Sequence, residues 1–134
     1  MANLVDIEGI GPEYAQKLQA AGLTTTEALL DQGGTPAGRK ALADRSGISE
    51  TRLLEWVNHV DLYRIGGIGS EYADLLEEAG VDSVPELAQR NPGSLAAKLA
   101  EINEAKNLVR RVPDEAEVSA WIQEAKTMPR AVSH

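Results

Sequence analysis

The residues best placed to do chemistry form two short glycine turns, in which the backbone would act rather than a side chain. Each turn has two glycines, which permit positive φ and close backbone approach, around one isoleucine that anchors it inward. Amides at such a turn, and at the start of the helix that follows, can donate to an anion because a helix begins at the positive end of its dipole. These candidate contacts for a phosphate or a partner are Gly9, Ile10 and Gly11 in the first turn and Gly67, Ile68 and Gly69 in the second.

Acidic residues stand beside both turns. Glu13 and Glu71 occupy equivalent positions just after each turn. Glu8 adds a charge in the first turn, and Pro12 removes one amide there. A carboxylate in the first turn of a helix stabilises that helix by itself. The same carboxylate also puts a like charge where a phosphate would sit, so the glycine turns alone do not predict phosphate binding.

A set of basic side chains could supply the missing positive charge. Lys and Arg provide much of the affinity for a nucleic-acid backbone, because neutralised phosphates release their counterions. Two interpretations stay open for this set, an ordinary solvated surface and a ligand-facing patch. The second requires the cations to share a face with a glycine turn. The candidates are Arg39, Lys40, Arg45, Arg64, Lys106, Arg110 and Arg111.

The sequence contains no recognisable catalytic or metal-binding set. It has no nucleophile elbow, no phosphate loop ending in Lys and Ser or Thr, and no acid pair framed by apolar residues. The acidic pair Glu77-Glu78 is expected on a solvated surface, and the two histidines, His59 and His134, lie far apart in the chain. We therefore predict that the protein is not an enzyme and has no metal, no cofactor and no small-molecule substrate.

An internal repeat shows which elements position the turns. Residues 7–23 align with residues 65–81 at an offset of 58, and 10 of the 17 aligned positions are identical. Duplication of one structural unit explains this similarity better than chance. A second correspondence, which pairs Trp56 with Trp121, has a larger offset. The second copy therefore carries an insertion, which we place near 103–113.

Capping residues, glycines and prolines divide both copies into helices. Apolar residues recur at helical spacing, and no alternating run is long enough to predict a strand. Predicted helix starts lie at Pro12, near Thr24 to Thr26, at Thr35-Pro36, Ser49, Ser70, Ser83, Asn91-Pro92 and Pro113-Asp114. We predict Trp56 and Trp121 in the core, and Tyr14 and Tyr72 partly buried with their hydroxyl groups bonded nearby.

The pattern around each turn resembles the helix-hairpin-helix motif, in which spaced apolar residues precede Gly-hydrophobic-Gly and an Ala and a Leu follow. The first copy matches at Leu4, Ile7, Gly9, Ile10, Gly11, Ala15 and Leu18, and the second at Leu62, Ile65, Gly67, Ile68, Gly69, Ala73 and Leu76. The resemblance implies an all-α fold of tandem helix-hairpin-helix repeats. It predicts two similar five-helix modules, joined stiffly because 58–65 lacks a flexible linker.

Two further segments look like degenerate hairpins. Residues 42–49 keep the apolar framework, with serines in place of the flanking glycines, and 108–114 keep no glycine. Over nearly the whole chain, the arrangement is similar to an uncharacterised family of tandem helix-hairpin-helix proteins classed as a domain of unknown function. The segments that carry this similarity are 61–73 and 87–92. The similarity implies a shape and no activity.

Composition and charge limit the remaining classes. The 134 residues have 43% hydrophobic and 25% charged side chains, which predicts a folded chain. The net charge of -8, with -4 in each half, excludes a broadly basic nucleic-acid binder. The absence of cysteine, of a signal peptide and of any apolar run near membrane-spanning length predicts a cytoplasmic protein without membrane contact. We predict modules at 1–61 and 62–127 and a frayed tail at 128–134.

Two functions of different class follow from these observations. The acidic balance, the glutamates beside the turns and the absence of a catalytic set favour a protein-interaction adaptor or scaffold, bound to a protein partner or to a second copy of itself. The two intact hairpins and the basic clusters favour the alternative, sequence-independent binding of a DNA or RNA backbone through the two Gly-Ile-Gly turns. Whether a monovalent cation sits at the hairpin carbonyls is left open.

Overall fold

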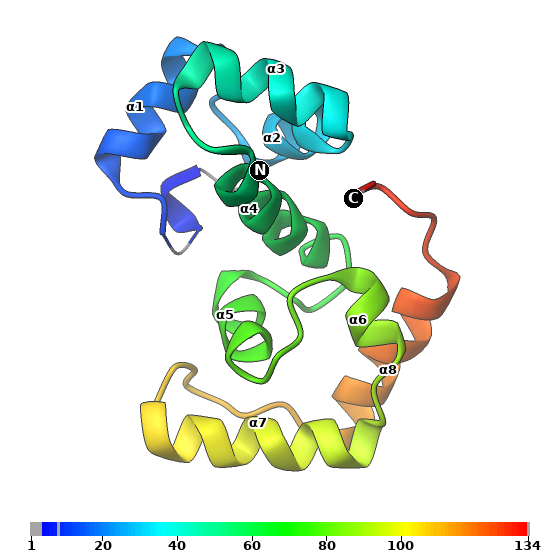
Figure 1. The fold of residues 1–134 in the computed structure, drawn as a ribbon. Coiled ribbons are helices and arrows are strands. Elements are labelled where there is room, and N and C mark those ends of the chain that lie inside the picture. Colours follow the sequence, from blue (N-terminus) through cyan, green and yellow to red (C-terminus); the bar gives the residue numbers. More distant parts are fainter. Residues whose placement is uncertain (1–3, 8, 134) are drawn as a thin grey trace. The chain divides into compact units, whose positions relative to one another are not determined.

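All regular elements in the described part of the chain are helices. The computed structural model describes residues 4–7 and 9–133 (Figure 1). In chain order the elements are the 3-10 helix η1 (Leu4–Asp6) and the α-helices α1 (Pro12–Ala20), α2 (Thr26–Gly33), α3 (Pro36–Ser46), α4 (Glu50–Leu62), α5 (Ser70–Glu78), α6 (Val84–Ala88), α7 (Pro92–Lys106) and α8 (Glu115–Thr127). The predicted all-helical fold class is thereby confirmed. Within the described ranges, no helix has both the length and the apolar character needed to cross a membrane.

The chain forms two compact units. The first contains residues 1–61 together with 130–134, and the second contains residues 62–129. The first unit includes η1, α1, α2 and α3 and nearly all of α4, and the second holds α5 to α8. Five helices were predicted in each module, but the described part of the second unit has four of its own. The reason is that α4 continues without interruption to Leu62, so the residues before the second glycine turn form no separate helix.

Short polar side chains start most of the helices, at the residues where the sequence predicts helix starts. Each accepts a hydrogen bond from the backbone amide three residues ahead, which satisfies one of the free amides at a helix N-terminus. In α8, Glu117 also accepts from the Asp114 amide, which completes a capping box. The capping side chains are Thr25, Thr35, Ser49, Ser83, Asn91 and Asp114.

The core of the first unit is built from aliphatic side chains and one tryptophan, because the sequence contains no phenylalanine. Helix α2 packs against α3, and α1 contacts both α3 and η1. In this core Trp56 is 4% exposed, which confirms its predicted burial. The other buried hydrophobic residues of this unit are Leu4, Ile7, Ile10, Leu18, Leu23, Leu29, Leu42, Ile48, Leu53, Val57, Val60 and Val132.

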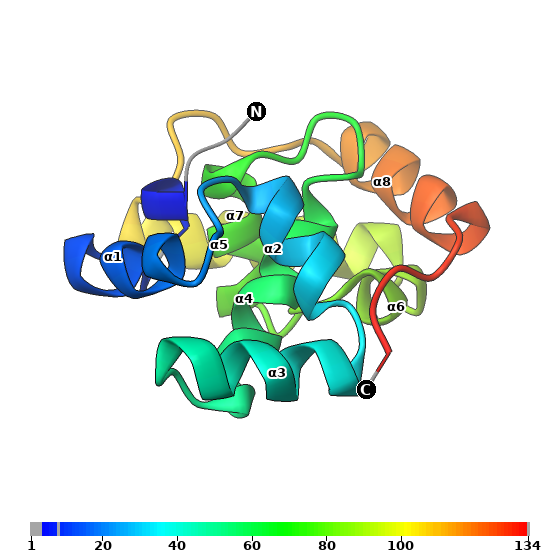
Figure 2. The same cartoon turned by 90° about the horizontal axis from the view of Figure 1, so that it is seen from above.

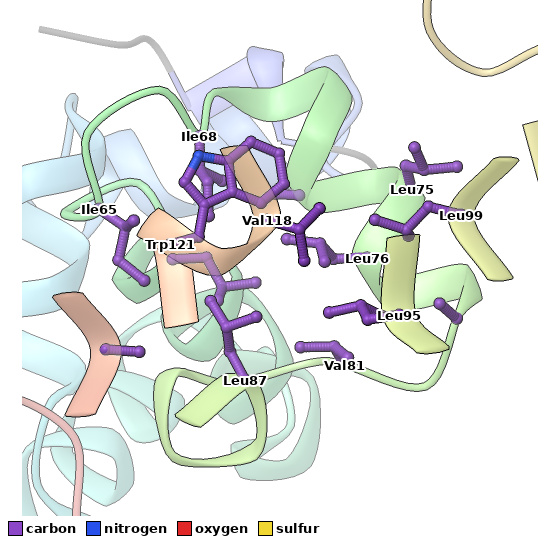
Figure 3. Close-up of a cluster of buried hydrophobic side chains, with 14 of the residues drawn as sticks. Ile65, Ile68, Leu75, Leu76, Val81, Leu87, Leu95, Leu99, Val118 and Trp121 are labelled. Carbon is purple, nitrogen blue, oxygen red and sulfur yellow. The ribbon is translucent and has the colours of Figure 1, made fainter. Parts of the chain in front are cut away.

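The core of the second unit is also built from aliphatic side chains around one tryptophan. Helix α8 packs against α6 and α7, and α7 packs against α5. Figure 3 shows Trp121 and Val118 of α8 among the isoleucines of the second turn and the leucines of α5 and α7. Trp121 is 4% exposed, like Trp56 in the first unit. Burial of leucine-sized side chains contributes about 1.5–3 kcal/mol each, so this cluster is the main source of the unit's stability.

The inserted residues of the second copy lie in α7 and in the loop after it. Helix α7 has 15 residues, whereas α3 has 11. The loop 107–114 then connects α7 to α8, in place of the short connection 47–49 between α3 and α4. Asn103 holds this loop, because its side chain both donates to Val109 O at 3.1 Å and accepts from Val109 N at 2.9 Å.

The segment 42–49, which the sequence predicts to be a degenerate hairpin, contains one glycine, Gly47. Gly47 has φ 74 and ends α3, with its amide donating to Ala43 O at 2.9 Å. Its left-handed conformation is the one that Gly9 adopts in the intact hairpin. The interpretation that serines replace both flanking glycines is therefore wrong, because Gly47 directly precedes the buried Ile48 as Gly9 precedes Ile10.

The segment after α8 is packed, in contrast to the predicted frayed tail. Val132 is 4% exposed, and the Ser133 amide donates to Gly34 O at 2.7 Å. Figures 1 and 2 show this end of the described chain beside the start of α3. The prediction failed because the partners of Ser133, Gly34 and Arg39, are about a hundred residues away in sequence. His134, also part of the predicted tail, lies outside the described residues.

Candidate functional site

The two glycine turns have nearly the same backbone geometry. In the first, Ile7 N donates to Leu4 O and Ile10 N donates to Ile7 O, both at 3.1 Å. In the second, the corresponding bonds of Ile65 and Ile68 have the same lengths. The repeat seen in the sequence is therefore also a repeat of local structure.

The first glycine of each turn adopts a conformation that other residues disfavour. Gly9 has φ 92 and Gly67 has φ 90. A Cβ at Gly67 would lie 3.2 Å from Trp121 Nε1, and one at Gly9 would lie 3.5 Å from Trp56 Nε1. Each tryptophan thus lies directly beneath its glycine turn. Gly9 and Gly67 are therefore required for packing, whether or not the turn binds a ligand.

The isoleucine of each turn is buried rather than available to a ligand. Ile10 is 3% exposed and Ile68 is 4% exposed. Both anchor the turn inward, as their position between glycines predicts. Of the predicted contact residues in the turns, the glycines remain at the surface, where Gly9, Gly11, Gly67 and Gly69 are exposed.

The helices that follow the turns start without a side-chain cap. Gly11 and Gly69 are the N-cap residues of α1 and α5, and neither has a side chain to accept the first amides. In α1 Pro12 lacks an amide, and Glu13 is exposed in the first turn. In α5 Glu71 is exposed at the same position. Open amides and a nearby carboxylate therefore coexist at both turns.

A carboxylate already bonds to the second turn. The Gly66 amide donates to Glu124 Oε2 at 3.1 Å. Glu124 comes from α8, 58 residues further along the chain, so no local sequence pattern marks this contact. The acid partly satisfies the donors at this turn and adds a negative charge there. The equivalent position in the first turn, Glu8, lies outside the described residues.

An aromatic pair supports each turn. The rings of Tyr14 and Trp56 have centroids 5.2 Å apart in an edge-to-face arrangement. Tyr72 and Trp121 have the same centroid separation. Both tyrosines are half-buried, and the Tyr72 hydroxyl donates to Arg111 O at 2.8 Å, as predicted for a partly buried tyrosine.

The charges around the two pairs differ. The Tyr14 ring has two cations within cation–π range, with Lys17 Nζ at 5.5 Å and Arg52 Cζ at 5.1 Å from its centroid. Sequence repeat places Leu75 and Glu117 at the equivalent positions of the second unit. The first hairpin is therefore flanked by cations, which were not among the predicted contacts, and the second by a leucine and an acid.

Most of the predicted basic contacts are held by partners inside their own unit. Arg39, 4% exposed, is buried, which lowers the pKa of its guanidinium and removes it from the set of surface cations. The hydrogen bonds of Glu117 raise the pKa of Arg111, and those of Arg111 lower the pKa of Glu117. The observed partners are Gly33 O and Ser133 O for Arg39, Gln32 Oε1 for Arg45, Pro129 O for Arg64, Glu78 Oε2 for Lys106 and both carboxylate oxygens of Glu117 for Arg111.

Lys40 and Arg110 complete the predicted set, and they are placed differently. Both side chains are exposed, and neither makes a hydrogen bond or ion pair with the residues that the structure describes. Lys40 is in α3, and Arg110 lies in the loop 107–114.

One predicted basic residue lies close to the second glycine turn. The Tyr72 hydroxyl donates to Arg111 O, but the charge of Arg111 is neutralised by Glu117.

A shallow apolar depression lies beside the first hairpin. It has a volume of about 160 Å³ and is lined by Leu4, Val5, Ala15, Gln19, Leu23 and Thr24. Val5 at its rim is 53% exposed, and it is the one exposed large hydrophobic residue in the described ranges. The sequence analysis missed this depression, because η1 and α1 form it together.

The buried histidine has an altered titration. His59 in α4 is 6% exposed, and burial lowers its pKa from 6.5 to about 4. The side chain is therefore neutral at pH 7. His134 lies outside the described residues.

Comparison with known proteins gives a family and no activity. In the described residues the regular elements are all helices, and the chain divides into two compact units, each with a glycine turn. The model of the family described as a domain of unknown function (DUF4332) matches residues 8–128, so the chain belongs to this family. Among the curated proteins no significant match is found, and none is found among the solved structures.

Proposed function

We propose that the protein is a non-catalytic adaptor that binds a protein partner through the first unit. The observation that carries the proposal is the apolar depression beside the first hairpin, with Val5 exposed at its rim. Apolar surface that gathers in one patch, and not a single exposed side chain, marks protein-binding sites, and here Val5 joins the apolar lining of the depression.

The state of the charges supports a protein partner over a nucleic acid. Five of the seven predicted basic contacts are bonded within their own unit. The second turn already has the Glu124 carboxylate on one of its amides. A phosphate at that turn would have to displace this acid and approach Glu71, both unfavourable for an anion.

The adaptor proposal is tested by capture with matched surface variants. The full chain, immobilised, is expected to retain at least one protein specifically from extracts of the source cells. Val5→Asp should abolish that retention, because it puts a charge at the rim of the depression, while Lys40→Glu should not. Thermal melting should show both variants folded, since both side chains are exposed. Equal retention by the wild type and Val5→Asp would refute the proposed surface.

Binding to a nucleic-acid backbone is a second candidate, favoured by a separate observation. The N-termini of α1 and α5 have no side-chain cap, and Lys17 and Arg52 flank the first hairpin at Tyr14. Open amides and adjacent cations are the components of a phosphate contact.

Fluorescence anisotropy with labelled duplex and single-stranded DNA tests this candidate at about 50 mM salt, where phosphate contacts are strongest. Backbone binding predicts an affinity that falls as salt rises and that is weakened by Arg52→Glu. The absence of binding at tens of micromolar protein would exclude this candidate. Binding that does not respond to salt would also argue against phosphate contacts.

A further inference from the structure

The segment 130–133 is bound to the first unit as an extended peptide. It follows α8, the last helix of the second unit, but it is part of the first compact unit. It has no regular secondary structure of its own. Its contacts are therefore those of a short peptide on a folded surface.

Two polar contacts and one apolar contact hold the segment. The Ser133 amide donates to Gly34 O at 2.7 Å, and Arg39 Nη2 donates to Ser133 O at 2.5 Å. Between them these bonds use both backbone polar groups of Ser133. The Val132 side chain is 4% exposed. Arg39 Nη1 donates to Gly33 O at 2.8 Å, which fixes the guanidinium in place.

The receiving surface is shaped for a backbone. A Cβ at Gly34 would lie 2.8 Å from Ala131 O, closer than such atoms normally approach. Gly34 has φ -68, so close approach of the segment, and not backbone conformation, is what requires glycine there. The buried residues Gly33, Gly34 and Arg39 thus form the surface that receives the segment, which we call the seat.

We propose that this seat also accepts the segment 130–133 of a second copy, so that two chains exchange these segments and form a dimer. Both hydrogen bonds that tie Ser133 to the rest of the fold are made to the first unit. The segment follows Pro129 of the second unit, whose carbonyl accepts from Arg64 at 2.7 Å. The same bonds form whether the segment comes from the same chain or another. An exchange of identical elements between copies gives a closed, symmetric dimer.

Concentration and tether length decide between the two forms. A short tether gives an effective concentration in the millimolar range, so the intramolecular form dominates in dilute solution. The exchanged dimer is expected to become detectable when the protein approaches about 1 mM. A shorter tether should favour exchange, because it lowers the effective concentration of the segment at the seat of its own chain.

The test uses deletion of Pro129 and Arg130, both exposed, which shortens the tether by about 7 Å and leaves 131–133 intact. Light scattering after size-exclusion chromatography should show a dimer fraction several-fold above that of the wild type at about 100 µM. Adding Arg39→Met to the deletion should restore the monomer, because the seat is lost. Monomers at all concentrations for both the wild type and the deletion variant would overturn the proposal.

A complementation experiment measures the exchange between two different chains and does not depend on folding of the deletion variant. One chain carries Arg39→Met, with a defective seat and an intact segment, and the other lacks 130–134 but keeps the seat. The chain has no cysteine, so Lys98→Cys, at an exposed position, allows donor and acceptor dyes to be attached. Energy transfer between these two chains is expected, and adding Val132→Asp to the first should abolish it. Two folded chains without energy transfer would exclude exchange.

The exchange goes beyond the proposed adaptor function because it uses another surface. Val5→Asp should leave energy transfer unchanged, and Arg39→Met should leave capture of a partner at the Val5 depression unchanged. The two proposals can therefore fail separately.

Discussion

At the scale of single residues, the glycines of the two hairpins have different tasks. Gly67 adopts positive φ above Trp121, whereas Gly69 has φ -107 and would have nothing within 4 Å of an added Cβ. The sequence motif contains both glycines and does not distinguish their roles. The structure separates a glycine that conformation and packing require from one that neither requires.

This difference predicts unequal effects of alanine substitution. Gly67→Ala should lower the free energy of unfolding by roughly 1–3 kcal/mol, because alanine is strained at positive φ and its Cβ would crowd the indole. Gly69→Ala should lower it by only a few tenths of a kcal/mol up to about 1, as for other N-cap changes. Urea denaturation of both variants gives the comparison. Equal losses would contradict the assigned roles.

The buried histidine predicts a pH dependence of stability. Burial lowers the pKa of His59 from 6.5 to about 4, so the unfolded chain binds a proton more readily than the folded chain. The stabilising contribution is therefore complete above about pH 6.5 and is lost as the pH falls toward 4. Lowering the pH from 7.5 to 5 should cost roughly 2 kcal/mol from this residue.

Urea unfolding at several pH values measures this effect. His59→Gln should show a smaller loss between pH 7.5 and 5 than the wild type, because it removes the titrating group. The carboxylates are present in both proteins, so the difference between the two pH profiles is the effect of replacing His59. Parallel pH profiles would show that His59 does not control acid stability.

At the scale of elements, the chief difference between the repeats is the inserted part of the second unit. The longer α7 and the loop 107–114 occupy the place of α3 and its short connection. The loop is not loose, because Asn103 bonds both backbone groups of Val109 and the Tyr72 hydroxyl bonds Arg111 O. The inserted loop is thus bonded to Tyr72 of α5 and brings Arg111 to Glu117 of α8.

Removing the asparagine should release this loop. Asn103→Ala is expected to lower the free energy of unfolding by roughly 1–3 kcal/mol, because two partly buried groups of Val109 lose their partner. Hydrogen exchange of amides in 107–114 should quicken more than exchange in α8. Asn107→Gly is the matched control, since glycine adopts the φ of 52 at that position without cost. Unchanged exchange in the loop would contradict its attachment by Asn103.

At the scale of the whole molecule, the chain returns to its first unit after completing the second. Residues 130–133 end at the seat formed by Gly33, Gly34 and Arg39, so part of the first unit is assembled from the far end of the described chain. The net charge of -8 does not show where the charged side chains lie, and their positions decide what each can bind. Most of the candidate basic residues are bonded to groups of their own unit, while exposed glutamates lie just after both glycine turns.

This arrangement predicts that the buried arginine matters more than its exposed neighbour. Arg39→Met should lower the free energy of unfolding by roughly 2–3 kcal/mol, because two carbonyls lose a charged donor. Lys40→Met should change it by less than about 0.5 kcal/mol. Thermal or urea unfolding of the two variants tests the contrast. Similar stabilities would show that the segment 130–133 contributes little to the fold.

The sequence by itself determined the helices, their starts, the repeat and the two glycine turns. These features depend on local physics: capping side chains lie three residues from the amides they accept, and glycines and prolines restrict the backbone directly. Burial of Trp56 and Trp121 followed from helical spacing for the same reason. The positive φ of Gly47 is also a local property, because it is a glycine at the end of a helix. The interpretation that serines replace both glycines of this segment overlooked it.

Tertiary structure alone decided which charges are free and where the chain end binds. Arg39, Arg64, Lys106 and Glu124 bond to groups that are distant in sequence or placed by the packing of helices, with Glu124 and its Gly66 amide 58 residues apart. Composition and residue spacing do not predict such pairings, because the energy of a charge depends on the groups that folding brings around it. The hairpins could be located from the sequence, but their charge environment could not.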